Sequence, residues 1–271
     1  MTACGIPAGA EPLEGAIGKL VGVGVGPGNP DLLTRQAIEA IENADRVAAP
    51  AIAADVPGRA ESIVTAAIPG IHLERLVIAM PVAGRRNGRG AEGNGGGADG
   101  DGDGGGAATR SSYDMAARRI ACWLGAGENV AFVTLGDPNI YSTFPTVAQA
   151  VRTIVPELQT ETVAGICAFQ DLAARSGTVL LDGSQSLALV SARDGAGELR
   201  DALARPDRAV VVYKGGNHLP AIVSVLEEHG RLEGAVLGEL LGMPGERVVP
   251  LSQATGPVSY LASVIIPPGD P

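Results

Sequence analysis

The residues that could do chemistry in this sequence lie in loops that directly follow apolar strands. The first such loop is Gly22-Val-Gly-Val-Gly-Pro-Gly28, which lacks the third glycine at the spacing of a dinucleotide fingerprint, and the chain contains no GxxxxGK[ST] phosphate loop. The spacing therefore favours neither NAD nor ATP. Because glycine has no side chain and Pro27 fixes one dihedral angle, the loop can present rigid main chain to a ligand. A tight strand-to-helix turn explains the same residues.

A second loop gathers a carboxylate and several hydroxyl groups. It runs from Thr134 to Thr143 as Thr-Leu-Gly-Asp-Pro-Asn-Ile-Tyr-Ser-Thr. Ligands of open α/β sheets bind at the carboxyl ends of the strands, which favours Asp137 as a functional group. Asp-Pro also begins many ordinary type I turns, so a structural role stays open for Asp137.

A third loop, Ala164-Gly-Ile-Cys167, ends a predicted strand and leads into the helix that holds Phe169. Cys167 can line a pocket there. A buried, inert thiol is the commoner fate of such a cysteine.

The composition argues against several classes of partner. The formal net charge is −10, which argues against binding to nucleic acid or to an anionic membrane surface. The three cysteines lack CxxC spacing and the three histidines are scattered, so no metal site is predicted. The N-terminus has neither the basic nor the apolar region of a signal peptide, and no long apolar run follows. These features predict a cytoplasmic protein.

Strands and helices alternate along the chain, which predicts an α/β protein. Strands are expected at residues 19–25, 129–135, 160–163, 187–191, 209–213 and 235–240, and residues 62–69 and 73–81 are also compatible with strands. Helices are expected from a cap at Asn29 or Asp31 through Ile41, at 113–124, from the turn at 136–138 through Val151, and at 168–176, 198–203 and 219–228. Residues 258–266 alternate enough to join an antiparallel pair.

Breaks in this pattern predict two domains. We expect a flexible leader at 1–17, an N-terminal α/β domain at 18–155, a C-terminal α/β domain at 156–267 and a tail at 268–271. The tract 84–110 is rich in glycine and has no aliphatic residue larger than Ala. It cannot bury enough apolar surface to offset its ordering entropy, so it is expected to be a disordered insert.

The first two loops, taken in order, resemble the signatures of a known family. Gly22–Thr34, followed by Ala37 and by Ala44-Asp45, resembles the opening signature of the tetrapyrrole (corrin and porphyrin) methyltransferases. Val130–Thr143 is similar to the second signature, in the form found in family members that methylate precorrin-2 at C20. Both motifs are specific.

Two weaker segments extend this resemblance toward the C-terminus. Ala164–Phe169 is similar to the family's third region, and Val212–Gly215 is similar to the strand end that follows it. The third region usually reads Pro-Gly-Ile followed by Ser or Thr. Ala164 and Cys167 stand at those places here, which removes a fixed dihedral angle and a hydroxyl group.

The resemblance implies a two-domain α/β methyltransferase with its active site in the cleft between the domains. The implied reaction transfers a methyl group from S-adenosylmethionine to C20 of precorrin-2 or cobalt-precorrin-2 in cobalamin biosynthesis, by a homodimer. The alternatives are methylation of uroporphyrinogen III or of a later precorrin, a diphthine-type methylase that acts on a protein, and a non-catalytic binding protein.

The resemblance and the positions of the charged groups also suggest residue roles. The residues expected beside the methyl donor are Pro27, Gly136, Asp137, Ile140, Tyr141, Ser142, Ile166, Cys167 and Tyr213. Asp137, Tyr141 and a water molecule are the candidates to accept the proton lost from C20. The basic residues expected to contact the acetate and propionate carboxylates of the acceptor are Arg35, Lys214 and His218, although a solvated helix face also explains such charges.

Overall fold

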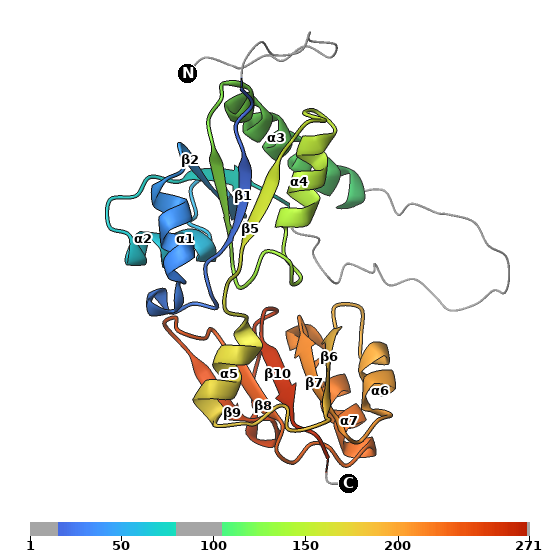
Figure 1. Ribbon diagram of the computed structural model, residues 1–271. Coiled ribbons are helices and arrows are strands. Elements are labelled where there is room, and N and C mark those ends of the chain that lie inside the picture. Colours follow the sequence, from blue (N-terminus) through green and yellow to red (C-terminus); the bar gives the residue numbers. More distant parts are fainter. Residues whose placement is uncertain (1–15, 80–104, 270–271) are drawn as a thin grey trace, which may run out of the picture. The chain divides into compact units, whose positions relative to one another are not determined.

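The computed structural model describes residues 16–79 and 105–269, which form two compact units (Figure 1). Of these described residues, unit 1 comprises those up to Gly24 and those from Arg35 to Ala164. Unit 2 comprises Val25–Thr34 and the described residues from Gly165 onward. None of the described helices is long and apolar enough to cross a membrane.

Unit 1 is built on a five-stranded parallel sheet of order β3-β2-β4-β1-β5. The strands are β1 (Leu20–Gly24), β2 (Arg46–Ala51), β3 (Glu74–Val77), β4 (Val130–Thr134) and β5 (Thr160–Val163). β1 lies between β4 and β5, with Gly24 opposite Thr134 and Val23 opposite Val163. The carboxyl ends of these three strands therefore lie at the same edge of the sheet.

Helices cover this sheet on both faces (Figure 1). They are α1 (Arg35–Glu42), α2 (Arg59–Ala67), α3 (Gly105–Gly125) and α4 (Phe144–Arg152). The short 3-10 helix η1 (Pro30–Leu32), which precedes α1 in the chain, belongs to unit 2. The helices α3 and α4 pack on one face, where Phe132 is fully buried and its ring centroid lies 6.1 Å from that of Phe144. A Cβ on Gly22 would lie 2.6 Å from the Phe144 ring, so only glycine lets α4 approach β1 this closely.

Unit 2 contains a mixed sheet of order β6-β7-β10-β8-β9. The strands are β6 (Ser186–Ser191), β7 (Arg208–Tyr213), β8 (Val236–Glu239), β9 (Arg247–Pro250) and β10 (Ser263–Ile266). β6 and β7 are parallel, whereas β10 pairs antiparallel with both β7 and β8. The antiparallel pairing expected for residues 258–266 is confirmed.

The strands of unit 2 bury alternate side chains on opposite faces, as the pleat requires. On one face Val211 and Ile265 pack with Leu172 of α5 (Ala168–Ser176). On the other face Val210 and Val212 pack against α6 (Gly197–Leu203) and α7 (Leu219–Glu228). The 3-10 helices η2 (Gly216–His218) and η3 (Leu251–Gln253) complete the unit.

The segment 25–34 joins unit 2 through close main-chain packing. A Cβ on Gly28 would lie 1.8 Å from the main-chain oxygen of Leu241. Gly242 has a positive φ of 68°, and a Cβ there would lie 2.2 Å from the nitrogen of Asn29. Both positions require glycine because two stretches of backbone are in contact.

The prediction of a strand at residues 62–69 is wrong, because this segment belongs to the helix α2. Ala60, Ile63 and Val64 are buried at helical spacing, and the Gly58 N–H donates to the Glu61 side chain at the start of the helix. A short apolar run fits either element until its caps are considered. The strands β2 and β9 were not predicted.

Residues 105–110 form the first turns of α3, so the expectation of disorder is wrong for this end of the 84–110 tract. Ala108 favours helix, and the apolar face from Ala116 to Leu124 packs in the core, so the helix propagates toward its N-terminus. Residues 84–104 lie outside the described residues, as do 1–15 of the expected leader and 270–271 of the expected tail.

The boundaries near residues 30 and 160 differ from the sequence pattern. Asn29 caps η1 as expected, its side chain accepting from the Asp31 N–H at 3.0 Å. The chain then extends at Leu33, and α1 starts only at Arg35. β5 pairs with β1, so residues 160–163 belong to the sheet of unit 1, and the division between the units follows Ala164.

The hydrogen bonds of the buried Arg231 should contribute to the stability of unit 2, which a substitution can test. Its guanidinium donates to the main-chain oxygens of Pro206 at 3.2 Å, Arg208 at 3.0 Å and Pro267. Arg231→Met leaves these carbonyls without their donor and should lower the free energy of unfolding by roughly 2–4 kcal/mol in urea titrations followed by circular dichroism. Arg205→Met, which removes an exposed pair with Asp207, is the control and should leave the unfolding midpoint close to that of the wild-type protein. Equal midpoints for the two variants would contradict this role of Arg231.

Candidate functional site

The loop that follows β4 is closed by a short hydrogen-bond network. Thr134 Oγ1 lies 2.9 Å from Ser142 Oγ, and the Phe144 N–H donates to the same Ser142 oxygen at 3.1 Å. Ser142 therefore joins the end of the strand to the start of α4. These hydrogen bonds therefore fix the distance between the two ends of the loop.

Asp137 organises the centre of this loop. Its Oδ1 accepts from the Asn139 N–H at 2.8 Å, and its main-chain oxygen accepts from the Ile140 N–H at 3.3 Å. The Asn139 side chain in turn donates to Thr162 of β5 at 3.4 Å. The turn role foreseen for Asp137 is present, and it orients a half-buried carboxylate at the carboxyl edge of the sheet.

The loop also shows backbone and hydroxyl features that are typical of ligand sites. Gly136 has a φ of 69° with no atom within 4 Å of a Cβ placed on it. Tyr141 is half-exposed and has a φ of 49°, which is costly for a residue with a large side chain. The buried Thr143 Oγ1 has no hydrogen-bond partner. A bound polar group would satisfy this hydroxyl.

In unit 2, Ile166, Cys167 and Tyr213 gather at the start of α5. Cys167 is buried at the N-cap, and its N–H donates to the Gln170 side chain at 2.8 Å. The Tyr213 hydroxyl accepts from the Phe169 N–H at 3.4 Å. Ile166 is half-buried, and Pro27 is buried in the segment 25–34.

The predicted basic residues fall into two environments. Lys214 and His218 lie together after β7, where Lys214 is half-buried with a φ of 59°. Burial, followed by the positive charge of Arg193, lowers the pKa of Lys214. Arg35 begins α1 in unit 1, with a side chain that is 94% exposed and 3.8 Å from Glu39. Its surroundings are those of a solvated helix face.

Three residues of these loops were not singled out from the sequence. Thr143 stands in the second motif, but its unpartnered hydroxyl is visible only in the structure. Arg193 follows the strand β6, and because ligands of α/β sheets bind at the carboxyl ends of strands, this position could have marked it as a candidate. Tyr260 precedes the antiparallel strand β10, and no sequence signal marks it.

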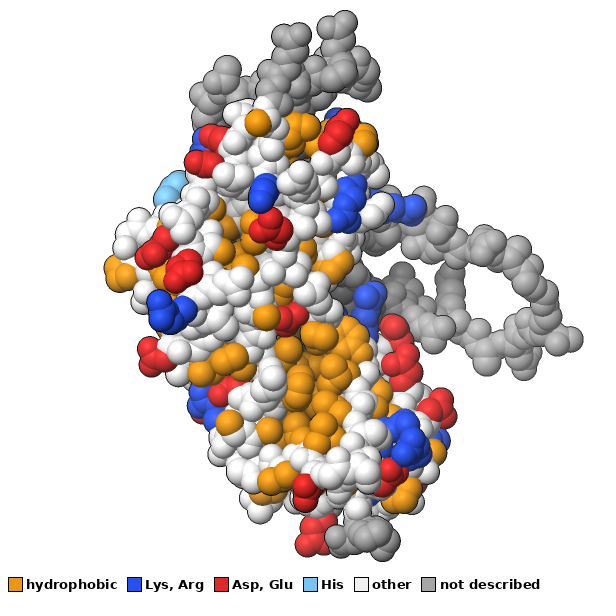
Figure 2. Space-filling view, in the orientation of Figure 1, with side chains coloured by type: hydrophobic (Ala, Val, Ile, Leu, Met, Phe, Trp, Pro, Cys, Tyr) orange, Lys and Arg blue, Asp and Glu red, His pale blue; other side chains and the backbone are white. Residues whose placement is uncertain are grey.

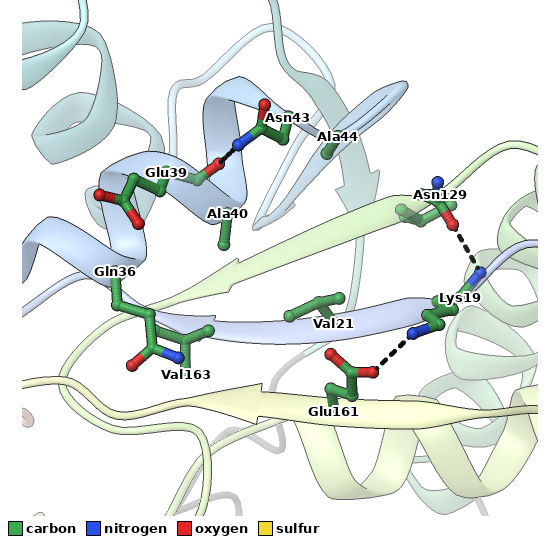
Figure 3. A pocket seen from close by; sticks show the side chains of 11 residues that line it. Lys19, Val21, Gln36, Glu39, Ala40, Asn43, Ala44, Asn129, Glu161 and Val163 are labelled. Carbon is green, nitrogen blue, oxygen red and sulfur yellow. Dashed lines mark hydrogen bonds and ion pairs between the residues drawn. The ribbon is translucent and has the colours of Figure 1, made fainter.

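A hollow of about 430 Å³ lies elsewhere in unit 1, beside α1 (Figure 3). It is lined by the following side chains: Lys19, Val21, Gln36, Glu39, Ala40, Asn43, Ala44, Asn129, Val130, Glu161 and Val163. Lys19 and Asn129 come just before β1 and β4, so the hollow includes the amino ends of these strands, and it contains none of the predicted site residues. Among residues 16–79 and 105–269, no group of three or more His, Cys, Asp or Glu residues could hold a metal ion.

Comparison with known proteins gives a family match and several relatives. Residues 19–255 match the family of Tetrapyrrole (Corrin/Porphyrin) Methylases. The precorrin-2 C(20)-methyltransferase of Sinorhizobium sp is 29% identical, over 93% of this chain and 96% of that protein. The cobalt-precorrin-2 C(20)-methyltransferase of Salmonella typhimurium is 30% identical, over 85% of this chain and 86% of that protein. The cobalamin biosynthesis protein CobIJ of Mycobacterium bovis is 33% identical, over 94% of this chain and 47% of that protein.

Solved structures share the fold at low sequence identity. The cobalt precorrin-4 methyltransferase CbiF superposes with a TM-score of 0.62 at 16% identity, covering 92% of this chain and 94% of that one. The uroporphyrin III C-methyl transferase of Thermus thermophilus has a TM-score of 0.61 at 21% identity, covering 92% and 97%. These two proteins are named for different substrates, so the fold alone does not select the acceptor.

Proposed function

The chain belongs to the tetrapyrrole (corrin/porphyrin) methylase family, and from this premise we propose that it methylates precorrin-2 or cobalt-precorrin-2 at C20 in cobalamin biosynthesis. The observation that carries the proposal is its nearly end-to-end similarity to proteins named for that reaction. The Thr134–Thr143 loop, in the form associated with C20 methylation, supports the same acceptor. A cytoplasmic location stays a prediction from the sequence.

The methyl donor in this proposal is S-adenosylmethionine, and the loop after β4 fits its methionine part. The Thr143 hydroxyl lacks a hydrogen-bond partner, and a Cβ on Gly136 would meet no atom within 4 Å, which supports the binding of a polar ligand at this loop. We assign this part of the donor to Gly136, Asp137, Ile140, Tyr141 and Ser142. In unit 2 we assign its ribose and adenine part to Pro27, Ile166, Cys167 and Tyr213.

The protein's task in such a reaction is mainly alignment. The donor, when bound, supplies an activated methyl group on a sulfonium. Holding the reactants in position can lower the activation barrier of a reaction by roughly 7–11 kcal/mol. The hydrogen bonds of Ser142 and the turn at Asp137 hold this loop in one conformation, as the positioning of a ligand requires. Asp137 or Tyr141 would accept the proton that leaves C20. Lys214 and His218 would bind acceptor carboxylates, whereas the exposed pairing of Arg35 with Glu39 adds no support to its predicted role.

An anaerobic transfer assay tests the proposed reaction. The purified protein is incubated with methyl-labelled S-adenosylmethionine and, in separate reactions, with precorrin-2, cobalt-precorrin-2 or uroporphyrinogen III. We expect one labelled methyl group to appear by mass spectrometry on precorrin-2 or on its cobalt complex. Labelling of uroporphyrinogen III alone would favour the alternative acceptor. Binding of S-adenosylhomocysteine without transfer to any tetrapyrrole would favour a binding protein or a protein methylase.

Two substitutions at Asp137 separate its turn role from a donor-binding role. Asp137→Asn keeps an oxygen that can accept from Asn139, whereas Asp137→Ala removes it. If the carboxylate contacts the ammonium group of the donor, both variants should bind S-adenosylhomocysteine at least about tenfold more weakly by calorimetry, since contacts to charged groups contribute about 1.5–3 kcal/mol. Wild-type affinity in Asp137→Asn would reduce Asp137 to a turn residue.

An exposed apolar surface in unit 2 supports the expected homodimer. The segment after α5 exposes 70% of Val179 and 47% of Leu181, next to the partly buried Leu187 and Leu189 of the edge strand β6. Figure 2 shows hydrophobic side chains gathered over this part of the unit 2 sheet. We propose that a second copy of the chain covers this surface, because an apolar patch beside the edge strand β6 suits a two-fold contact.

Light scattering coupled to size-exclusion chromatography tests this interface. The wild-type chain of 27.3 kDa should elute as a dimer. Leu181→Glu should shift the protein toward the monomer, since it places a charge in the proposed contact. The control is Ile52→Glu, at a residue 79% exposed in unit 1, which should leave the dimer intact. A monomeric wild-type protein, or an unchanged Leu181→Glu dimer, would contradict the assignment.

A further inference from the structure

Three loops meet at one end of the unit 2 sheet. Ser191 at the end of β6 lies opposite Tyr213 at the end of the parallel β7. Ser263 at the start of β10 lies opposite the same Tyr213 in antiparallel pairing. The residues that follow β6, follow β7 and precede β10 are therefore brought to the same place.

Main-chain contacts hold these loops together. The Ala192 N–H donates to the main-chain oxygen of Tyr213 at 2.9 Å. A Cβ on Gly216 would lie 2.1 Å from the main-chain oxygen of Ser259, so these two loops touch backbone to backbone. The His218 ring donates from Nε2 to the main-chain oxygen of Arg193 at 3.2 Å. His218 thus positions the loop that carries Arg193.

This end of the sheet concentrates positive charge. Arg193 is 42% exposed, and its charge acts on the half-buried Lys214, whose pKa is lowered first by burial and then by this neighbour. Asp194 comes only as near as 4.0 Å to the Arg193 guanidinium, and its own side chain is 95% exposed. Two cations that repel each other in a partly buried place are stabilised by a bound anion.

The loop that precedes β10 brings a hydroxyl group near Arg193. Burial raises the pKa of Tyr260, and the charges of Arg193 and Asp194 both act on its hydroxyl. The hydroxyl therefore stays protonated at neutral pH and is available as a donor. A guanidinium, an ammonium and a phenol form a donor set suited to the two oxygens of a carboxylate.

We propose that Arg193, Lys214 and Tyr260 form a subsite for one peripheral carboxylate of the tetrapyrrole acceptor, and that His218, in addition to its own proposed contact with the acceptor, is a positioning residue for Arg193. This assignment rests on the proposed function, since it takes its ligand from the acceptor of that reaction. It adds Arg193 and Tyr260 to the residues that recognise the acceptor. Arg193 is the specificity-determining member, because its planar fork can hold both oxygens of a carboxylate.

Steady-state kinetics of Arg193→Gln tests the subsite. The KM for the precorrin-2 acceptor should rise about tenfold, as expected when a charged contact is lost, while the KM for S-adenosylmethionine and kcat stay within about twofold. Raising the salt concentration should increase the acceptor KM of the wild-type enzyme more than that of Arg193→Gln. Arg193→Lys, which keeps the charge without the fork, should fall between the two.

Arg205→Gln is the matched control, because it removes an exposed arginine of the same unit that pairs only with Asp207 among the ion pairs of the described residues. It should leave all three constants unchanged. If the wild-type enzyme is active and Arg193→Gln behaves like Arg205→Gln, the subsite is wrong while the proposed function stands. If the wild-type protein transfers methyl to no tetrapyrrole, the proposed function fails and the subsite loses its ligand with it.

Discussion

The parallel pairing of β1 between β4 and β5 is the constraint on which the candidate loop of unit 1 depends. Its register sets Gly24 opposite Thr134, so the chain leaves β1 and β4 at the same edge. Gly22 makes this possible, because its missing side chain admits the Phe144 ring and lets α4 lie against the sheet. Once both ends of residues 134–144 are fixed, Ser142 and Asp137 can hold the loop with only a few hydrogen bonds.

Strand pairing also brings loops together in unit 2, and there the loops carry positively charged residues. The parallel β6 and β7 and the antiparallel β10 bring Arg193, Lys214 and Tyr260 to one end of the sheet. This local positive charge would let a chain with a net charge of −10 bind the proposed anionic acceptor. Screening limits charge effects to about 8 Å at physiological salt, so nearby residues outweigh the total.

Much of the fold could be predicted where periodicity and caps agree. The helices α5 and α7 begin and end as expected, because Cys167 caps the first and Pro220 starts the second. β2 was not predicted, and it pairs with β4 through Arg46–Ala48 and with β3 through Ala48–Ala51, so tertiary pairing extends the strand across Pro50 where local propensity disfavours one. Residues 62–69 are compatible with a strand because a short apolar run fits either element, whereas the capping at Gly58 marks the helix α2.

The candidate site was predictable where one motif contains all its parts, as in Thr134–Thr143. Arg193 could have been found from its position after a strand, whereas Tyr260 was not predictable, because it reaches this end of the sheet only through the pairing of β10 with β7. The central claim is methyl transfer to C20, and carbon-13 NMR of the product made with carbon-13-methyl S-adenosylmethionine tests it most directly. We expect the labelled methyl carbon to couple to C20 of the acceptor. A labelled methyl on any other ring carbon would contradict this claim.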